Sequence, residues 1–114
     1  MKIKLPSFLA SVLLELGLSD NLIGHFQGLE QFVELRSLDL VYNKIRHIKK
    51  LNHLENLKDL YSAGNKISTI EGLDGLRCLR KLDLCGNRIR SMRGLGNMMM
   101  IEELFVGLEQ DYRN

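Results

Sequence analysis

The chain has 114 residues, of which 45% are hydrophobic and 26% are charged, and its formal net charge is +2. This length suits one domain with a modest core, and the composition is typical of a globular protein rather than of a disordered or fibrous one. A net charge this close to zero does not by itself indicate a nucleic-acid partner.

The first twelve residues, MKIKLPSFLASV, stand apart because the pattern that begins at Leu13 does not extend to them. Pro6 is placed to begin a short helical turn, since proline suits the first turn of a helix. We therefore expect residues 1–12 to form a partial cap. Two serines and Glu15 interrupt the apolar run, and no small-residue cleavage site stands out, so we expect no secretion signal. No run of about 18 apolar residues predicts a membrane span.

From Leu13 onward the sequence repeats with a period of 22 residues. The stretch LDLVYNKIRHI at 38–48 returns as LYSAGNKISTI and again as LDLCGNRIRSM. The unit reads L-x-x-L-x-L-x-x-N-x-I-x-x-I-x-x-L-x-x-L. Its complete copies span residues 13–34, 35–56, 57–78 and 79–100, and a partial copy spans 101–108. An internal repeat of this length indicates a solenoid, in which each copy buries its apolar face by stacking on its neighbours.

Each copy predicts one short strand followed by a returning segment. In SLDLV, Leu38 and Leu40 alternate with other residues, so both lie on one face of a strand. Stacked copies would form a parallel sheet with about 4.8 Å between neighbouring strands. The apolar residues Ile45, Ile48 and Leu51 of the returning segment would close the core from behind.

The phrases NKISTIEGLDGL and NRIRSMRGLGNM contain the pattern N-x-I-x-x-I-x-x-L. This pattern resembles the leucine-rich repeat family, in particular the 22-residue class of eukaryotic cytosolic proteins typified by the regulatory subunit of type-1 protein phosphatase. The resemblance covers about residues 13–108 and implies an α/β solenoid. Such a solenoid is a right-handed superhelix with a short parallel β-sheet on its concave face and 3-10 or irregular return segments on its convex face. The fold alone specifies no single function.

The resemblance also implies a structural ladder of asparagines. Where the chain leaves each strand, its turn places backbone groups inside the solenoid, and an amide side chain has the donors and the acceptor to satisfy them. The predicted ladder consists of Asn21, Asn43, Asn65 and Asn87. Ser62 stands where other copies have an aliphatic residue, so it is either a local weak point or a partner for a neighbouring carbonyl group.

The fifth copy departs from the pattern, because Glu109 stands where the asparagine is expected. Residues 109–114 are a charged tail without a predicted cap, whereas members of the family usually close the solenoid with one. We therefore expect either a truncated product of a longer array or a last strand whose exposed edge favours self-association.

Residues that alternate with the buried leucines point outward and form the predicted binding surface, which we call the sheet face. Exposed aromatic residues are less expected there than acids, and they are enriched at binding hot spots. The alternative is that neighbouring side chains cover these rings across the strands. The predicted partner-binding residues are Asp39, Tyr42, Asp59, Tyr61, Lys81, Asp83, Glu103 and Phe105.

Positive charge collects beside the asparagines and in the return segments. The residues of this basic flank are Lys44, Arg46, His47, Lys49, Lys50, Lys66, Arg88, Arg90 and Arg93. An acidic sheet face with a basic flank would favour a basic partner on the sheet face and would steer its approach. The alternative is that long basic side chains only solvate the convex surface.

The sequence contains no motif of a metalloprotease, an α/β-hydrolase or a P-loop enzyme. Cys78 and Cys85 are expected on different sides of the solenoid, too far apart for a disulfide or a shared zinc ion, and free thiols suit a reducing compartment. Asp39 and Asp83 are expected on an open surface without a pocket that would shift their pKa values. We therefore expect no enzyme activity, no cofactor and no metal site.

These observations favour a non-enzymatic module that binds a protein partner through the concave sheet face, as a regulatory, cytoskeletal or ciliary scaffold. The resemblance implies type-1 phosphatase or an axonemal or cytoskeletal protein as the partner. It also implies a cytoplasmic location, including the cilium, the cytoskeleton or the nucleus. The alternative is an adaptor that associates with ribonucleoprotein or nucleic acid through the basic flank. That alternative ranks second because no aromatic residues for stacking lie among the basic ones.

Overall fold

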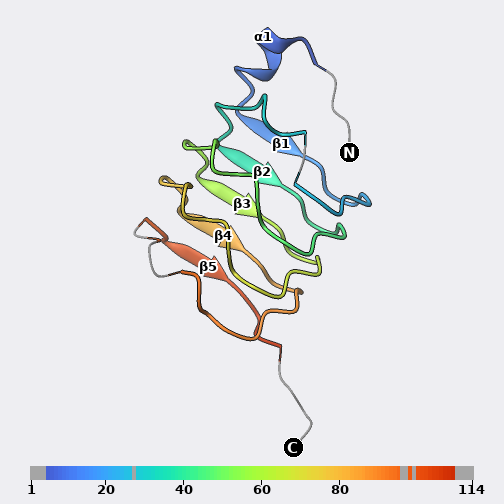
Figure 1. Cartoon of the computed structure of the whole chain (residues 1–114), viewed down its shortest axis with the longest axis vertical. Coiled ribbons are helices and arrows are strands. Elements are labelled where there is room, and N and C mark those ends of the chain that lie inside the picture. The colour runs from blue at the N-terminus through green and yellow to red at the C-terminus, as the bar shows by residue number, and fades with distance from the viewer. Residues whose placement is uncertain (1–4, 27, 96–97, 99, 110–114) are drawn as a thin grey trace, which may run out of the picture.

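Each copy of the repeat contributes one three-residue strand at its L-x-L segment. The strands are β1 (Glu15–Gly17), β2 (Ser37–Asp39), β3 (Asp59–Tyr61), β4 (Lys81–Asp83) and β5 (Glu103–Phe105). They pair in parallel and in chain order, so each strand lies beside those of the adjacent copies (Figure 1). This computed structural model describes residues 5–26, 28–95, 98 and 100–109.

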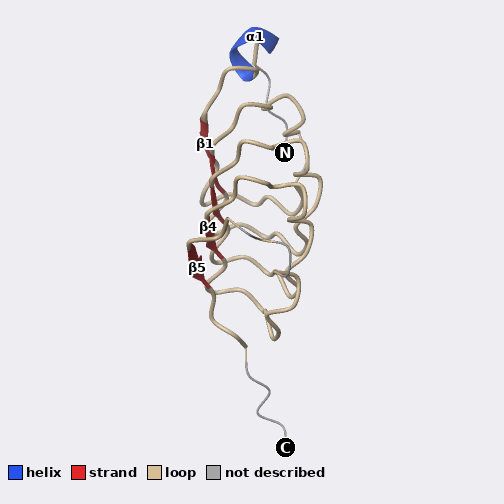
Figure 2. Cartoon of the chain, turned by 90° about the vertical axis from the view of Figure 1, so that its left-hand side faces the viewer, coloured by secondary structure: helices blue, strands red, loops and turns tan. Residues whose placement is uncertain are grey.

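The register of the sheet follows the period of the sequence. The residues paired along the core side are Leu16, Leu38, Leu60, Leu82 and Leu104. Because equivalent residues are aligned, every column of the repeat becomes a line along the solenoid. The strands lie on one side of the molecule and the return segments on the other (Figure 2). This arrangement confirms the predicted solenoid with a parallel sheet on one face.

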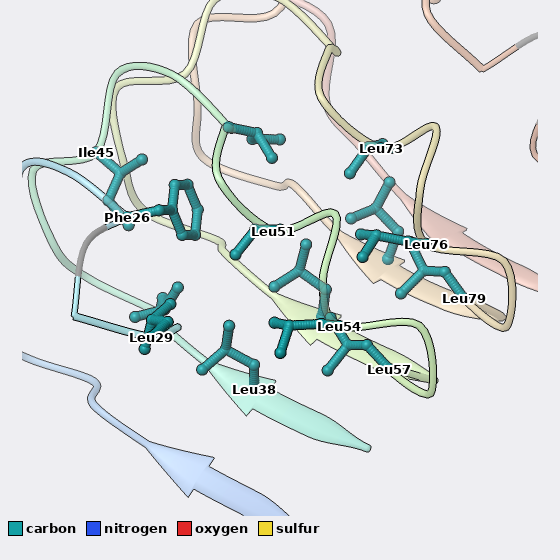
Figure 3. Close-up of a cluster of buried hydrophobic side chains, with 14 of the residues drawn as sticks. Phe26, Leu29, Leu38, Ile45, Leu51, Leu54, Leu57, Leu73, Leu76 and Leu79 are labelled. Atoms are coloured by element: carbon teal, nitrogen blue, oxygen red, sulfur yellow. The ribbon is translucent and has the colours of Figure 1, made fainter. Parts of the chain in front are cut away.

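The hydrophobic core lies between the sheet and the return segments. Leu38, Leu60 and Leu82 of the three middle strands have no exposed surface. Side chains from successive return segments, such as Leu54 and Leu76, point into this core (Figure 3). Burial of one leucine side chain contributes about 1.5–3 kcal/mol, so the repeated leucines supply much of the stability.

The return segments are held by successive turns rather than by a regular helix in the part of the chain described. At the end of the second copy and the start of the third, the backbone amides of Leu54 and Leu57 donate to the carbonyls of Leu51 and Leu54, at 2.9 and 3.1 Å. Equivalent bonds join Leu29, Phe32 and Leu35 one copy earlier, and Leu73, Leu76 and Leu79 one copy later. The i to i+3 spacing of these bonds is that of a 3-10 turn and places an apolar residue toward the core every three residues.

A single short helix, α1 (Ser7–Ala10), lies at the N-terminal end of the described chain. It follows Pro6, whose carbonyl accepts the amides of Leu9 and Ala10 at 3.0 and 3.1 Å. Ala10 is buried in the core. That this segment acts as a cap stays a prediction, and residues 1–4 of it lie outside the described residues, as do residues 110–114 of the tail. No described helix is long and apolar enough to cross a bilayer.

Candidate protein-binding surface

The sheet face consists of two rows of outward-pointing residues that cross the five strands. The first row is Glu15, Ser37, Asp59, Lys81 and Glu103, and the second is Gly17, Asp39, Tyr61, Asp83 and Phe105. In the three middle strands these residues are half-buried, whereas the leucine between them is buried. The sheet therefore brings together all the predicted partner-binding residues except Tyr42, which lies beyond the end of β2.

Charges in the first row are compensated. The ammonium group of Lys81 lies 3.4 Å from the carboxylate of Glu103 on the next strand, and this acid, followed by Tyr61 and Asp59, raises the pKa of Lys81 above its ordinary value. Asp59 Oδ1 is buried without a hydrogen bond, but Arg80 Nε lies 3.6 Å away, within the range of an ion pair. The sheet face is therefore less acidic than its strand residues alone suggest.

The two aspartates of the second row have a local structural role that the sequence analysis missed. Asp39 Oδ1 accepts the backbone amide of Val41 at 3.0 Å, and Asp83 Oδ1 accepts that of Cys85 at 3.1 Å. Such bonds to the amide two residues later stabilise the turns that follow β2 and β4. The recurrence of an aspartate just before the turn, at Asp39 and Asp83, is the feature of the sequence that could have predicted this role.

The two strand aromatics differ in exposure. Phe105 is 48% exposed, whereas Tyr61, which was also expected to be exposed, is half-buried. Tyr61 has Asp39 and Asp83 on the strands to either side, while the strand of Phe105 is paired on one side in the described sheet. Pairing on both sides of Tyr61 and on one side of Phe105 agrees with this difference in exposure, as the alternative interpretation of these positions expects.

Tyr42 is the most exposed aromatic residue of this surface and has an unusual backbone. Its side chain is 63% exposed, and its φ is 58°. The equivalent residues in other copies, Asp20, Gly64 and Gly86, have φ values of 57°, 69° and 66°. The tyrosine ring lies over Gly64, because a Cβ atom on this glycine would be 2.8 Å from Cε1 of the ring. A left-handed conformation costs a non-glycine residue about 1–2 kcal/mol.

The asparagines lie beside this surface, inside the turns. Asn43, Asn65 and Asn87 each accept a backbone amide from the preceding copy through Oδ1, at 3.1, 3.0 and 3.0 Å. The side-chain amide of Asn65 also donates to the carbonyls of Leu40 and Ser62, at 2.9 and 3.0 Å. Each of these asparagines therefore joins two adjacent copies and is occupied by backbone groups.

Asn21 and Glu109, at the ends of this column, make different contacts. Asn21 is exposed, and its side-chain amide donates to the carbonyls of Leu18 and Ser19 in its own turn. At Glu109 the backbone amide donates to the Ile89 carbonyl at 2.6 Å. The inter-copy bonds of the column therefore run from Asn43 to Asn87 among the described residues.

Ser62 has a partner, although not the one anticipated. The residue is fully buried, and its hydroxyl oxygen accepts a hydrogen bond from the side-chain amide of Asn65 at 3.3 Å. The partner is thus an amide nitrogen and not a carbonyl group. Since Asn65 is a member of the asparagine column, the serine joins the core to that column.

The geometry offers little for catalysis or metal binding. Both cysteines are free. Partial desolvation of the Cys85 thiol, followed by the negative charge of Asp83, raises its pKa, and this disfavours the reactive thiolate. Within the described residues, no three His, Cys, Asp or Glu side chains cluster as metal ligands would. A groove beside Lys81 and Glu103 has a volume of about 180 Å³, and an open depression beside His47 and Glu71 has about 370 Å³. The first is below and the second at the lower end of the range of about 300–1,000 Å³ typical of ligand pockets.

Two residues of the basic flank lie close to an acidic side chain. His47 Nδ1 lies 3.1 Å from Glu71, and Arg90 Nε lies 3.9 Å from Glu109. All of these side chains are well exposed. Exposed pairs of this kind contribute little to stability.

Residues 78–98 match the family model of the Leucine Rich Repeat. A search of curated protein sequences found no significant match. The family match covers the end of the third copy and most of the fourth, where the pattern NRIRSMRGLGNM stands.

Solved structures of bacterial repeat proteins are similar to the whole described solenoid. An internalin (inlF) from Listeria monocytogenes aligns with a TM-score of 0.78 at 24% identity, over 95% of this chain and 32% of that one. Internalin C2 of the same organism gives 0.79 at 27% identity, over 89% and 44%. A leucine-rich repeat protein from Leptospira interrogans gives 0.76 at 26% identity, over 91% and 28%. The chain thus spans less than half the length of each of these structures.

The family match and the shared fold support a leucine-rich repeat family for this chain. Assignment to the 22-residue cytosolic class, and the likeness to the phosphatase subunit, remain predictions from the sequence.

Proposed function

We propose that the chain is a non-enzymatic module that binds a protein partner through the sheet face and the adjoining Tyr42. Solenoids of this fold are typical scaffolds for protein–protein interaction, because stacked copies offer an extended surface. The observation that carries the proposal is the conformation of Tyr42, an exposed ring on a strained backbone. Two of the equivalent positions are glycine, which avoids that strain.

The left-handed backbone recurs at Asp20, Gly64 and Gly86, and Tyr42 is the position of this column where it carries an exposed aromatic ring. A residue in a sparsely populated backbone region persists when the surroundings hold it there, and such residues cluster at binding sites. Tyr42 buries little of its own surface, so its hydrophobic contribution to folding is small. The same ring would bury its surface in a complex, where tyrosine is enriched among hot-spot residues.

Charge in this interface would provide orientation rather than most of the affinity. Lys81 and Glu103 compensate each other, and Asp59 lies beside Arg80. The remaining acids, such as Asp39 and Asp83, favour a partner with a basic patch. Tyr42 and Phe105 would then supply the apolar contacts of the complex.

The partner we propose first is a type-1 phosphatase catalytic subunit or an axonemal or cytoskeletal protein, with the chain acting as a regulatory or ciliary scaffold in the cytoplasm. The support for this choice is the sequence pattern NKISTIEGLDGL, which resembles the 22-residue cytosolic class. The alternative, an adaptor for ribonucleoprotein or nucleic acid, ranks second. The segments 44–46, 66–68 and 88–90 of the basic flank contain no aromatic residue on which bases could stack.

The test compares Tyr42→Gly with wild type in quantitative pull-downs from a eukaryotic lysate and with purified type-1 phosphatase catalytic subunit. Phe8→Ala, which removes a 74% exposed aromatic from α1, is the matched control. We expect Tyr42→Gly to unfold at the same denaturant concentration as wild type or a higher one, because strain is relieved. We also expect it to weaken partner binding about tenfold or more.

Two results would overturn the proposal. Lower stability of Tyr42→Gly with unchanged binding would make the tyrosine a structural residue. An equal loss of binding in Phe8→Ala would remove the sheet face as the site. If the phosphatase does not bind while another protein is lost on Tyr42→Gly, the module is retained and the identity of its partner is wrong.

A further inference from the structure

Three basic residues form a column along one edge of the solenoid. Lys44, Lys66 and Arg88 each follow an asparagine of the inter-copy column. Their backbone amides donate to carbonyls of the preceding copy, at 2.8, 2.8 and 2.7 Å, and the acceptors are Ile23, Ile45 and Ile67. The hydrogen bonds fix the spacing of the three residues, just as they fix the strands of the sheet.

The side chains of this column face outward. The next residues in the chain, Ile45, Ile67 and Ile89, have no exposed surface. Neighbouring side chains in an extended segment point in opposite directions, so the residues on either side of each isoleucine point away from the core. All of them are exposed except Lys66, which is partly exposed. Arg46 and Arg90 therefore extend the column, and we call Lys44, Arg46, Lys66, Arg88 and Arg90 the basic strip.

Positive charge in the basic strip is largely uncompensated. Arg90 lies near Glu109, with 3.9 Å between their charged groups. The other four residues take part in no ion pair among the residues that the structure describes. The sheet face differs, because Lys81 there has Glu103 beside it. Like charges on adjacent strands repel, so the strip opposes folding slightly, and an acidic partner would remove that repulsion.

We propose that the basic strip binds an acidic α-helical segment of a protein, with the axis of that helix parallel to the stacking direction of the copies. Adjacent copies are about 4.8 Å apart. Successive turns of a helix are about 5.4 Å apart, and residues at i and i+4 share one face. Carboxylates at i, i+4 and i+7 span about 10.5 Å along the helix, so they would match the column of Lys44, Lys66 and Arg88, about 9.6 Å long, to within about 1 Å. Flexible lysine and arginine side chains absorb such a difference.

A nucleic acid fits the basic strip less well. Phosphates of duplex DNA follow one another every 3.4 Å along the axis, roughly, which does not match the spacing of the copies. Single strands are usually held by base stacking as well as by charge. The residues interleaved in the strip are isoleucines and Ser68, none of which offers a stacking surface.

The strip is independent of the sheet-face proposal and has a different role. The basic strip spans three copies and offers too little area for a stable complex on its own, since stable interfaces bury about 1,200–2,000 Å². An exposed charged contact mainly accelerates association and selects among partners. Tyr42 lies only two residues before Lys44 in the chain, so one partner could contact both regions.

Two fluorescent peptides of about 20 residues, long enough to form helices in isolation, would serve as probes. The two peptides have the same amino-acid composition. One places a glutamate on the same face at every turn, and the other distributes the glutamates around the helix. Anisotropy titrations at low salt would compare them with a single-stranded RNA of similar charge. We expect the one-face peptide to bind about fivefold more tightly than its isomer, and more tightly than the RNA.

Two charge-reversal variants locate the contact. The test variant is Lys44→Glu with Lys66→Glu and Arg88→Glu. The control, Arg36→Glu with Lys58→Glu and Arg77→Glu, changes the net charge equally at exposed residues elsewhere. We expect the test variant to bind the one-face peptide about tenfold more weakly or worse, and the control to stay within about threefold of wild type. Circular dichroism verifies folding, and Lys66→Glu alone replaces the triple variant if that variant unfolds.

Three outcomes would overturn the inference. Equal losses in both variants would show that net charge alone attracts the peptide. Equal binding of the two peptides would show that the spacing of the copies is irrelevant. Tighter binding of the RNA, lost in the test variant, would identify nucleic acid as the ligand of the strip.

Discussion

The middle copies and the end copies of the solenoid share one residue pattern but not one environment. Leu60 of β3 has no exposed surface, while Leu16 and Leu104, at equivalent positions of β1 and β5, are only partly buried. Asn65 joins two copies, whereas Asn21 contacts only its own turn among the described residues. Equivalent residues of different copies therefore contribute different amounts of stability, because the neighbouring copies provide much of the surface that each residue contacts.

Exposed apolar surface gathers toward the same end copies. The exposed residues of the first copy and of α1 include Phe8, Val12 and Leu22, and those near β5 include Met100, Phe105 and Leu108. In the second and third copies, Tyr42 is the one described large hydrophobic residue that is exposed. The prediction that the edge of β5 favours self-association is compatible with this distribution and stays a prediction.

The largest expected difference between middle and end concerns the core leucines. Leu60→Ala would leave a cavity between two packed neighbours, and we expect it to lower the free energy of unfolding by about 2–5 kcal/mol. Leu104→Ala should lower it by about half as much or less, because that side chain is already partly exposed. Urea unfolding followed by circular dichroism measures both. Equal losses would mean that position in the stack does not matter.

The next difference concerns the asparagines. Asn65→Ala would leave the buried amide of Ile45 without its acceptor. It would also remove donors to the carbonyls of Leu40 and Ser62. We expect a loss of about 1–3 kcal/mol, the usual cost of an unsatisfied buried group. Asn21→Ala is the matched control and should cost less than about 1 kcal/mol, because Asn21 is exposed.

Amide hydrogen exchange would locate the effect of the Asn65→Ala substitution. Faster exchange at the Ile45 amide, with the first copy unaffected, would agree with a bond that joins neighbouring copies. A loss in Asn21→Ala as large as in Asn65→Ala would contradict the comparison, since it would indicate that the bonds between copies contribute nothing.

The sequence alone predicted the features that depend on the period. Leu38, Leu60 and Leu82 recur every 22 residues, so their alignment in one sheet and their burial follow from the spacing. The position of the asparagines after each strand likewise follows from the repeated unit. These features were predictable because every copy contains the same residues in the same order.

Features that depend on the identity of a neighbour were not predictable. Glycines at 64 and 86 indicate a left-handed backbone at this position of the repeat, but nothing in the repeated unit shows that the Tyr42 ring lies over Gly64. The bond between Ser62 and Asn65 depends on a serine that one copy alone carries. The half-buried state of Tyr61 does not follow from the repeated unit either, because its column holds different residues in the adjacent copies. The variable positions thus determine both the predicted site and its departures from expectation.

The smallest expected effect concerns the ion pair that joins β4, a middle strand, to the end strand β5. Glu103 is the main cause that raises the pKa of Lys81. A lysine pKa that is higher in the folded state favours folding below the ordinary lysine pKa, and this contribution is lost as the pH rises through the raised value. Both side chains are solvent-accessible, so salt should weaken the effect.

Glu103→Gln should therefore return the pKa of Lys81 toward its ordinary value, with less effect on stability than Leu60→Ala or Asn65→Ala. An NMR titration of the lysine side chains at low salt measures the shift. Glu102→Gln removes the adjacent acid, which is not among the causes of the raised pKa, and is the matched control. A similar drop in the control would show that the overall negative charge near β5, rather than the cross-strand pair, acts on Lys81. An unchanged pKa in Glu103→Gln would mean that the last strand does not hold its carboxylate over the sheet in solution.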